Sequence, residues 1–331
     1  MEIDKNIELK KNDQFSQLKG LDLQELLFKI QNFDLIYRKK LQLPSNVNFG
    51  IVLEYEDVKK ENVDNYVQEN LNLWISKKDA SIAIGGEINS PILYDELTSW
   101  EELQKICNFL KKKNANTSKN AGGHIHIGTH ILGDNVDNWK MFLKTYAAYE
   151  SVLFRFLFGD KITGRKKILD FAKPITDNLY DKIYWINHAR SLFQLYEDLP
   201  KERRQALNFV NTNFENVENQ RFKNTLEFRS PNATIEEVIW QNNINALTKL
   251  ILAPIKGLID QEFLDYKLEH ERISSKKEYY LYSLINLKNA LELVDLIFDN
   301  NLDKLYFLRQ YLKNFEENYT ANETINAKKF F

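Results

Sequence analysis

Two histidines stand two residues apart in the stretch NAGGHIHIGTHI, residues 120–131, behind a glycine pair and inside an apolar run. Residues i and i+2 of a β-strand project from the same face, so His124 and His126 project together. His130 follows on that face if the strand stays regular. Such a pair is often only a solvent-facing or locally hydrogen-bonded pair, but imidazole nitrogens are also common metal ligands.

Two other stretches repeat this spacing with charged side chains. The stretch NFGIVLEYE, residues 48–56, places Glu54 and Glu56 on one strand face opposite an apolar face, and Glu227 and Arg229 stand two apart in TLEFRSPNAT. Each has a simpler explanation, either the exposed side of an edge strand or a surface ion pair that contributes ~0–1 kcal/mol. Their combined occurrence instead favours one polar and functional sheet face.

The side chains on this face suit metal-assisted phosphoryl transfer. Carboxylates are ligands for Mg²⁺ or Mn²⁺, ions that commonly bridge the phosphates of ATP. A structural zinc site requires cysteines, and the chain has only Cys107. Neither a GxxxxGK[ST] loop nor a GxGxxG loop is present. We therefore expect metal ions and arginines on a sheet to hold the phosphates.

Strands and helices that position these residues alternate without a repeating βαβ unit, which predicts an α+β fold with a mostly antiparallel sheet. The segment 72–93 predicts two short strands joined by a turn at KKDA. Ser99 and Glu102 predict a capping box, and Thr234 is the expected N-cap of another helix. Helices are predicted, in chain order, over 22–41, 99–113, 136–158 and 235–259, with one or two more over 276–319.

Composition excludes several classes of protein. The 331 residues are 43% hydrophobic, which is enough for a substantial core. With 45 basic and 47 acidic side chains, the net charge of -2 gives no field that attracts nucleic acid. No run of about 18 apolar residues predicts a membrane span. The single cysteine excludes an intrachain disulfide, and the polar start lacks a secretory signal, so a cytoplasmic location is the default expectation.

Five segments in order, FGIVLEYE, WISKKDASIAIGGEINSPIL, AGGHIHIG, RRQALNF and TLEFRSPNAT, resemble the amidoligase family. This family belongs to the carboxylate–amine ligase superfamily and is related to glutamine synthetase and glutamate–cysteine ligase. The resemblance covers about residues 48 to 245, and its specificity comes from the order of the segments. It implies a curved antiparallel sheet of the glutamine-synthetase-like catalytic type, flanked by helices. It also implies an ATP-dependent ligase that makes an amide or peptide-like bond through an acyl phosphate.

The resemblance also assigns roles to residues of this sequence. Glu54 matches the second glutamate of a G-x-E-x-E strand and Glu87 the glutamate of E-I-x-S-P, both metal ligands. His124 matches the ligand of the metal next to the transferred phosphate. Its implied companions are the metal ligand Glu227, the phosphoryl-holding Arg229, and the nucleotide- or substrate-facing residues His126, Asn208 and Arg204.

The sequence departs from this pattern at Val52, where the family has the first glutamate of G-x-E-x-E. An aliphatic side chain cannot bind a metal. Three explanations stay open: Glu56 replaces the missing ligand through a bulge or a register shift, the site binds fewer ions, or catalysis is lost. The last leaves an alternative function, a catalytically silent nucleotide-binding or scaffold protein. A metal-dependent hydrolase that uses His124 and His126 is less favoured because no third ligand stands at a recognisable spacing.

The remaining expectations concern the surroundings of the site. Four cationic residues lie where the family places substrate-facing residues, although surface positions are almost as common for such side chains: Arg165, Lys173, Arg203 and Arg204. We predict a lead-in over 1–47, a catalytic domain over 48–260, and a helical C-terminal extension over 261–331 packed on it. Expected partners are small-molecule or peptide carboxylates and amines, with a further copy or another protein bound through the C-terminal helices. No nucleic acid or membrane partner is expected.

Overall fold

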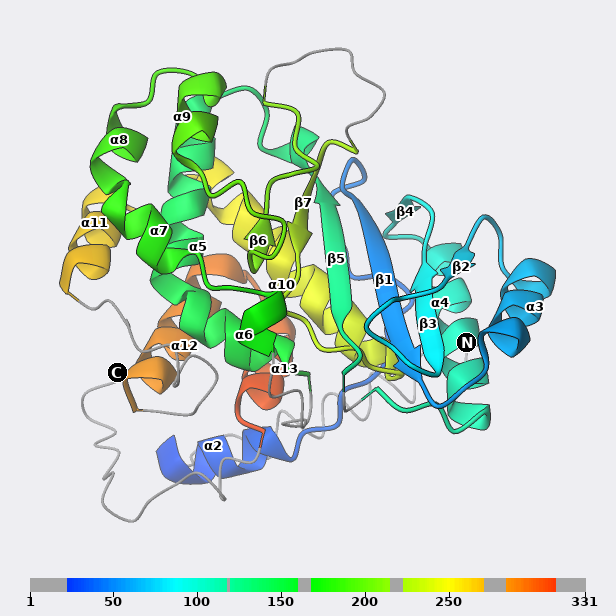
Figure 1. Ribbon diagram of the computed structural model, residues 1–331. Coiled ribbons are helices and arrows are strands. Elements are labelled where there is room, and N and C mark those ends of the chain that lie inside the picture. The colour runs from blue at the N-terminus through cyan, green and yellow to red at the C-terminus, as the bar shows by residue number, and fades with distance from the viewer. Residues whose placement is uncertain (1–22, 118–119, 160–167, 215–222, 271–283, 314–331) are drawn as a thin grey trace.

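The computed structural model describes residues 23–117, 120–159, 168–214, 223–270 and 284–313. Its strands form one open sheet in the order β2-β3-β1-β5-β7-β6, with β4 paired to β1 (Figure 1). Every strand pair is antiparallel, which confirms the predicted antiparallel sheet. The strands are β1 (Asn48–Glu56), β2 (Ile75–Lys77), β3 (Gly85–Asn89), β4 (Leu93–Tyr94), β5 (Gly123–Gly128), β6 (Leu207–Asn208) and β7 (Thr225–Phe228).

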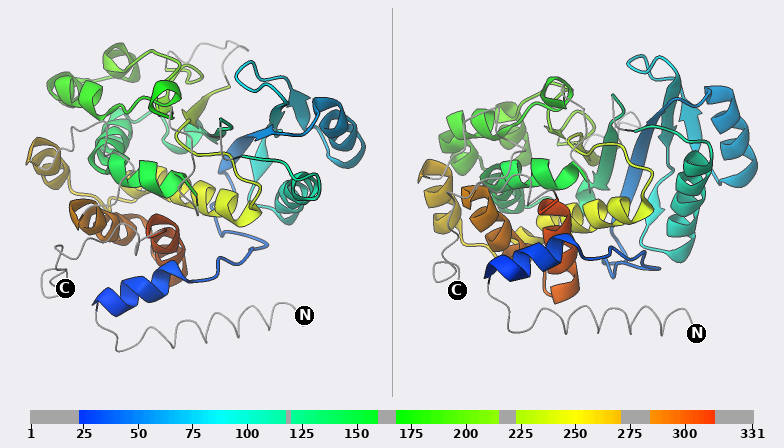
Figure 2. Two further views of the ribbon diagram at one scale, coloured as in Figure 1. Left: turned by 60° about the horizontal axis from the view of Figure 1, so that its bottom comes forward. Right: turned by 90° about the horizontal axis from the view of Figure 1, so that it is seen from below.

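Helices cover one face of this sheet in two layers. Helices α4, α5 and α10 lie next to the sheet, and α12, α13 and α2 lie beyond α10 (Figure 2). The helices are α2 (Leu23–Gln31), α3 (Lys60–Asn70), α4 (Leu97–Lys112), α5 (Val136–Leu157), α6 (Ile168–Phe171), α7 (Thr176–Asp181), α8 (Ile183–His188), α9 (Leu192–Asp198), α10 (Glu237–Ile255), α11 (Gln261–His270), α12 (Leu284–Ile297) and α13 (Asn301–Tyr311). No helix in the described ranges is both long and apolar enough to cross a membrane.

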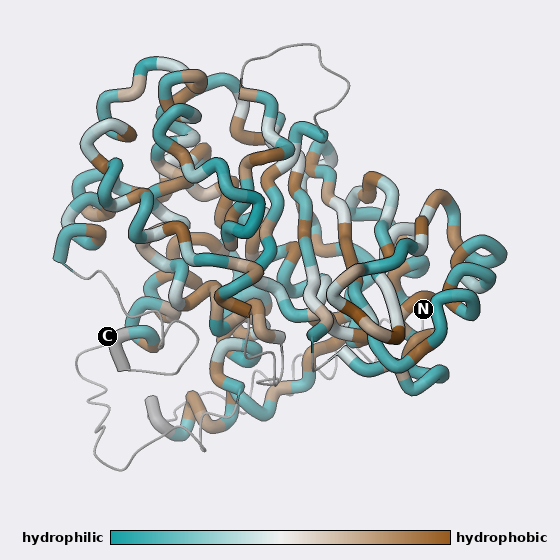
Figure 3. The backbone as a smooth tube through the Cα atoms, in the orientation of Figure 1, coloured by the Kyte–Doolittle hydropathy of each residue, from teal (hydrophilic) through white to brown (hydrophobic). Residues whose placement is uncertain are grey.

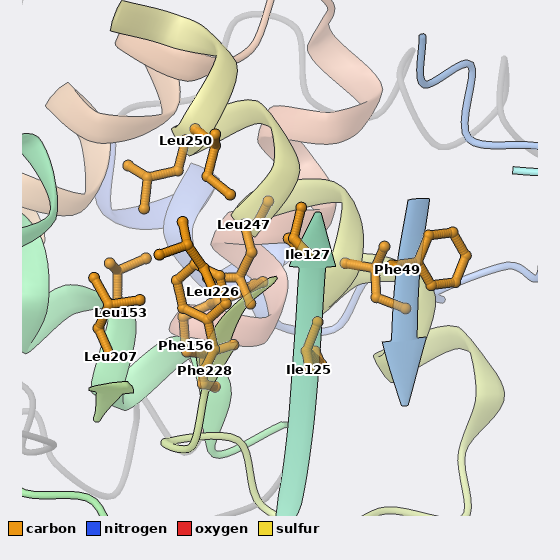
Figure 4. Packing of buried hydrophobic residues seen from close by; sticks show 14 of the residues in the cluster. Phe49, Ile125, Ile127, Leu153, Phe156, Leu207, Leu226, Phe228, Leu247 and Leu250 are labelled. Carbon is orange, nitrogen blue, oxygen red and sulfur yellow. The ribbon is translucent and has the colours of Figure 1, made fainter. Parts of the chain in front are cut away.

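The core lies between the sheet and its inner helices (Figure 4). Alternate residues of the strands, such as Ile125 and Ile127, are fully buried against leucines and phenylalanines of α5 and α10. The Phe49 ring stacks on Trp100 of α4 with ring centroids 5.1 Å apart. Full burial of each such side chain stabilises the fold by ~1.5–3 kcal/mol. The outer helix α3 is largely hydrophilic by contrast (Figure 3).

Strand register sets which polar side chains meet on the other face. In the ladders, Glu54 is opposite Glu87, Val52 is opposite His124, and His126 is opposite Glu227. Because side chains alternate between the two faces, these residues all project away from the helices.

Several element predictions are corrected. The helix expected over 22–41 ends at Gln31, because the chain after it is held extended by other elements, for example by the Asp95 carboxylate that accepts from Leu41 N and Leu43 N. The histidine strand ends at Gly128 and continues into a short 3₁₀ turn. His130 therefore leaves the strand face and contacts the Asn46 carbonyl at 2.6 Å.

Helix starts give mixed results. The capping box is wrong, since α4 begins at Leu97 and Glu102 instead accepts from the Trp74 indole N–H at 2.9 Å. The expected N-cap Thr234 is also wrong, because α10 begins at Glu237 with Glu236 as its N-cap, although the Thr234 hydroxyl accepts from Glu236 N at 3.0 Å. The long apolar helix predicted over 136–158 is confirmed as α5.

Candidate functional site

A cleft of about 1140 Å³ opens over the polar face of the sheet. Its lining comes from the central strands, the loop 78–81 and the segments around β6 and β7. It includes eight of the nine site residues expected from the sequence, namely Glu54, Glu87, His124, His126, Arg204, Asn208, Glu227 and Arg229. Residues far apart in the sequence thus converge on one cavity of the size that small ligands occupy.

His124 lies between two glutamates at the centre of the cleft. Its Nε2 is 3.6 Å from Oε1 of Glu54 on β1, and its Nδ1 is 3.4 Å from Oε1 of Glu227 on β7. All three residues are buried. The three neighbouring strands β1, β5 and β7 therefore contribute one continuous row of polar groups.

Glu227 organises the far end of this row. One oxygen accepts from the Arg229 guanidinium at 2.5 Å, and the other accepts from the Asn208 amide at 2.7 Å. A buried carboxylate needs such donors, because an unpaired charge in this environment is costly. The guanidinium of Arg229 is in turn held at a fixed place in the cleft.

Three carboxylates converge at the other end of the row. Single oxygens of Glu54, Asp79 and Glu87 all lie within 4.8 Å of one another. Asp79 was not predicted from the sequence. Its Oδ1 accepts from the backbone N–H and the hydroxyl of Ser81, which holds the loop 78–81 in a tight turn over the sheet. The only signal in the sequence is the turn KKDA, whose aspartate is more commonly a turn residue than a ligand.

The chain matches the model of a family described as "putative amidoligase enzyme" over residues 46–251. This range is more than half of the chain and contains every residue that lines the cleft. The chain belongs to this amidoligase family. No curated protein matches the chain.

Glu56 does not supply the carboxylate that Val52 lacks. The ladders from β1 to β3 and β5 run without a bulge, so Glu56 stays four residues along the strand from Val52, about 13 Å away. Its carboxylate accepts from the backbone and the side-chain amide of Asn120, at 3.1 and 3.0 Å, and does not line the cleft. Of the three explanations left open for Val52, the ladders therefore contradict replacement by Glu56 through a bulge or a register shift. The carboxylate that joins Glu54 and Glu87 in the cleft is that of Asp79.

Cationic side chains form the wall of the cleft on the side of α6, where Arg203 and Arg204 join Arg229. The Arg204 guanidinium lies over the Phe171 ring, 5.6 Å from its centroid. Within the described residues, neither Arg203 nor Arg204 has a carboxylate partner. In the part of the chain that the structure describes, Arg203 and Arg204 therefore add positive charge to this wall that no ion pair neutralises, whereas Arg229 is paired with Glu227.

His126 is neutral at physiological pH. Burial lowers its pKa to about 4, while the neighbouring Glu227 opposes this shift. Its Nδ1 lies 3.1 Å from the Thr225 hydroxyl. A neutral imidazole is suited to hydrogen bonding or metal ligation rather than to holding an anion by charge.

Two other candidates that the structure describes, Lys173 and Cys107, do not line the cleft. Lys173 pairs with Glu202 at 2.8 Å outside the lining. Arg165 lies outside the described residues. Cys107 is fully buried in α4, as expected for a core residue, and burial raises the pKa of its thiol.

Proposed function

We propose that this protein is an ATP-dependent carboxylate–amine ligase on a sheet of the glutamine-synthetase-like catalytic type. ATP phosphorylates a substrate carboxylate, releasing ADP, and an amine displaces phosphate from the acyl phosphate to form an amide. The single observation that carries the proposal is the placement of an acidic cluster and a cationic wall in one cleft of an amidoligase-family chain. Phosphoryl transfer needs both, because its catalysis is mostly positioning and charge stabilisation.

The acidic cluster fits Mg²⁺ or Mn²⁺. Around Mg²⁺ the oxygen ligands sit at about 2.1 Å in an octahedron, so pairs of ligand oxygens are about 3 to 4 Å apart. The oxygens of Glu54, Asp79 and Glu87 lie within 4.8 Å of one another, close to that spacing. Three carboxylates this close repel one another unless a cation joins them. A bound ion would neutralise phosphate charge and hold the γ-phosphate in line with the carboxylate.

The side chains of the chain have distinct roles in this scheme. Arg229 and Arg204 bind phosphate oxygens, for which guanidinium groups offer several donors. Glu227 orients Arg229 by accepting a hydrogen bond from its guanidinium, and Asn208 in turn orients Glu227 by donating to its other oxygen. His124 lies between Glu54 and Glu227 and presents one ring nitrogen to each of these carboxylates. The substrate carboxylate and the amine enter over the same face of the sheet. Arg203 offers a further cationic contact for an anionic group of a ligand.

Val52 supports a second candidate, a catalytically silent nucleotide-binding or scaffold protein of the same fold. Its side chain lines the cleft beside His124 and offers no ligand atom. Such a protein would bind nucleotide weakly and release no ADP with any acceptor, and its C-terminal helices would contact a partner.

Calorimetric titration with ATP, with and without Mg²⁺, tests the proposal. We expect magnesium-dependent binding that weakens in Glu87→Ala and in Glu227→Ala. Glu61→Ala, on the outer helix α3, is the matched control and keeps the binding of the natural protein. ADP release that requires an added amine separates the ligase from the silent protein. Absence of nucleotide binding in the natural protein contradicts both.

A further inference from the structure

Glu150 is a buried carboxylate that does not line the cleft. It projects from α5 with 1% of its surface exposed. Its two oxygens accept from Ile175 N at 2.9 and 3.0 Å, and one accepts from Thr176 N at 2.9 Å and the Thr176 hydroxyl at 2.6 Å. Burying a carboxylate is unfavourable unless hydrogen-bond donors surround it, so breaking these bonds would be costly. The bonds to Glu150 therefore hold the backbone at residues 175 and 176 in place.

The anchored segment continues directly to the cleft wall. Two residues before Ile175, Lys173 forms a backbone bridge with the strand-like segment around Gln205. Lys173 N donates to Arg204 O at 2.7 Å, and Ala206 N donates to Lys173 O at 2.8 Å. The carbonyl of Ala206 then accepts from Arg229 N at 2.8 Å. Backbone hydrogen bonds thus connect the segment held by Glu150 to the two arginines of the cleft.

Phe171 lies at the start of the same segment and touches both arginine side chains. The Arg204 guanidinium carbon lies 5.6 Å from the centroid of the Phe171 ring, and the Phe171 carbonyl accepts a hydrogen bond from Arg229 Nε at 3.5 Å. Two of the three cationic side chains in the wall therefore rest on one residue. A displacement of this residue would move both guanidinium groups.

We propose that Glu150 is a positioning residue of the cleft, which holds the segment 171–176 and thereby sets Arg204 and Arg229 for an anionic ligand. The identity of this ligand as a nucleotide rests on the proposed function, but the positioning does not. Glu150 makes no contact with the ligand itself. Its effect passes through Phe171 and the bridge at Lys173.

Hydrogen exchange in the full-length protein tests the positioning without any ligand. In Glu150→Ala we expect faster exchange of the amides of Lys173, Ala206 and Arg229, with unchanged exchange in β1 and β3. Ser151→Ala is the matched control, because this adjacent buried residue of α5 bonds Asn286 of α12, away from the cleft. It should leave those three amides unchanged. An equal increase over the whole sheet, or none at the three amides, overturns the inference.

Ligand binding provides the second measurement, with Mg²⁺–ATP and pyrophosphate as probes at a temperature where all variants are folded. We expect Glu150→Ala to bind about tenfold more weakly, which corresponds to about 1.4 kcal/mol. Glu150→Gln keeps one carbonyl acceptor and the size of the side chain, so it should recover part of the affinity. It also replaces Glu150→Ala in both measurements if that variant does not fold.

The two proposals fail in different ways. If the natural protein binds neither probe, the ligase proposal fails, and the exchange measurement decides the positioning of the arginines. If probes bind the natural protein and Glu150→Ala equally well, the positioning inference is overturned while the ligase proposal stands.

Discussion

Val52 lies directly opposite His124 in the ladder between β1 and β5, and both side chains line the cleft. The family strand that these residues resemble carries a glutamate at the valine position. Asn89 is opposite Val52 on its other side, in β3. Val52 therefore leaves no carboxylate beside His124 at this point of β1, and the acidic cluster is formed by Glu54, Glu87 and Asp79 of the loop 78–81.

Restoring the missing carboxylate should strengthen metal-dependent binding. We expect Val52→Glu to bind ATP with Mg²⁺ about tenfold more tightly, a gain of about 1.4 kcal/mol, because a fourth carboxylate faces the cluster. Val52→Gln has the same size without the charge and should show no gain. Calorimetry measures both. An equal change in the two variants would mean that side-chain size, and not ligation, controls the site.

Removing the charge of Asp79 should have the opposite effect. Asp79→Asn keeps the bond to Ser81 but removes one anionic oxygen from the cluster, so we expect Mg²⁺-dependent ATP binding to weaken by about tenfold. Asp134→Asn makes the same change at an exposed position outside the cleft. Both variants are titrated with Mg²⁺ at constant ATP. If Asp79→Asn binds like Asp134→Asn, Asp79 is only a turn residue.

The glycine before His124 is needed for close packing. A Cβ on Gly123 would stand 2.6 Å from Cη2 of Trp240 and 2.9 Å from the Asn232 carbonyl oxygen, so Gly123→Ala should lower the free energy of unfolding by about 1–3 kcal/mol. Gly50→Ala, on the neighbouring strand, meets only ordinary contacts of 3.7 Å and beyond and should change it by less than about 1 kcal/mol. Urea unfolding compares the two. Equal destabilisation would contradict the packing argument.

Glu150 should make stability depend on pH. Burial raises its pKa from the ordinary 4.5 to about 7, with a smaller contribution from Asp177, although hydrogen bonds from Thr176 and Ile175 oppose the shift. The folded state therefore holds the proton more tightly than the unfolded state. The contribution of this group to stability is largest below pH 4.5 and is lost as the pH rises through 7. Glu150→Gln, which cannot titrate, should lack this decline.

Unfolding of both proteins across pH 4 to 8 measures the difference. All other titrating groups, including His126, are common to the two proteins, so subtracting the curves isolates Glu150. A difference that does not change with pH would contradict the raised pKa.

Part of the site follows from local sequence alone. The period of two in a strand determines that Glu54 shares a face with Val52, that His124 shares one with His126, and that Glu227 shares one with Arg229. The order of the five segments likewise indicated the amidoligase family, which the match over residues 46–251 confirms. These are properties of neighbouring residues and of their order, and they need no knowledge of how the chain returns on itself.

Only the tertiary structure decided which other side chains reach the cleft and which leave it. Asp79 reaches the cleft because its loop folds over the sheet, Glu56 is turned to Asn120 because the ladder continues without a bulge, and His130 leaves the face because β5 ends early. Each of these outcomes depends on the path of a loop or the end of a strand. Such features are set by contacts between distant segments, and a local period of two carries no information about them.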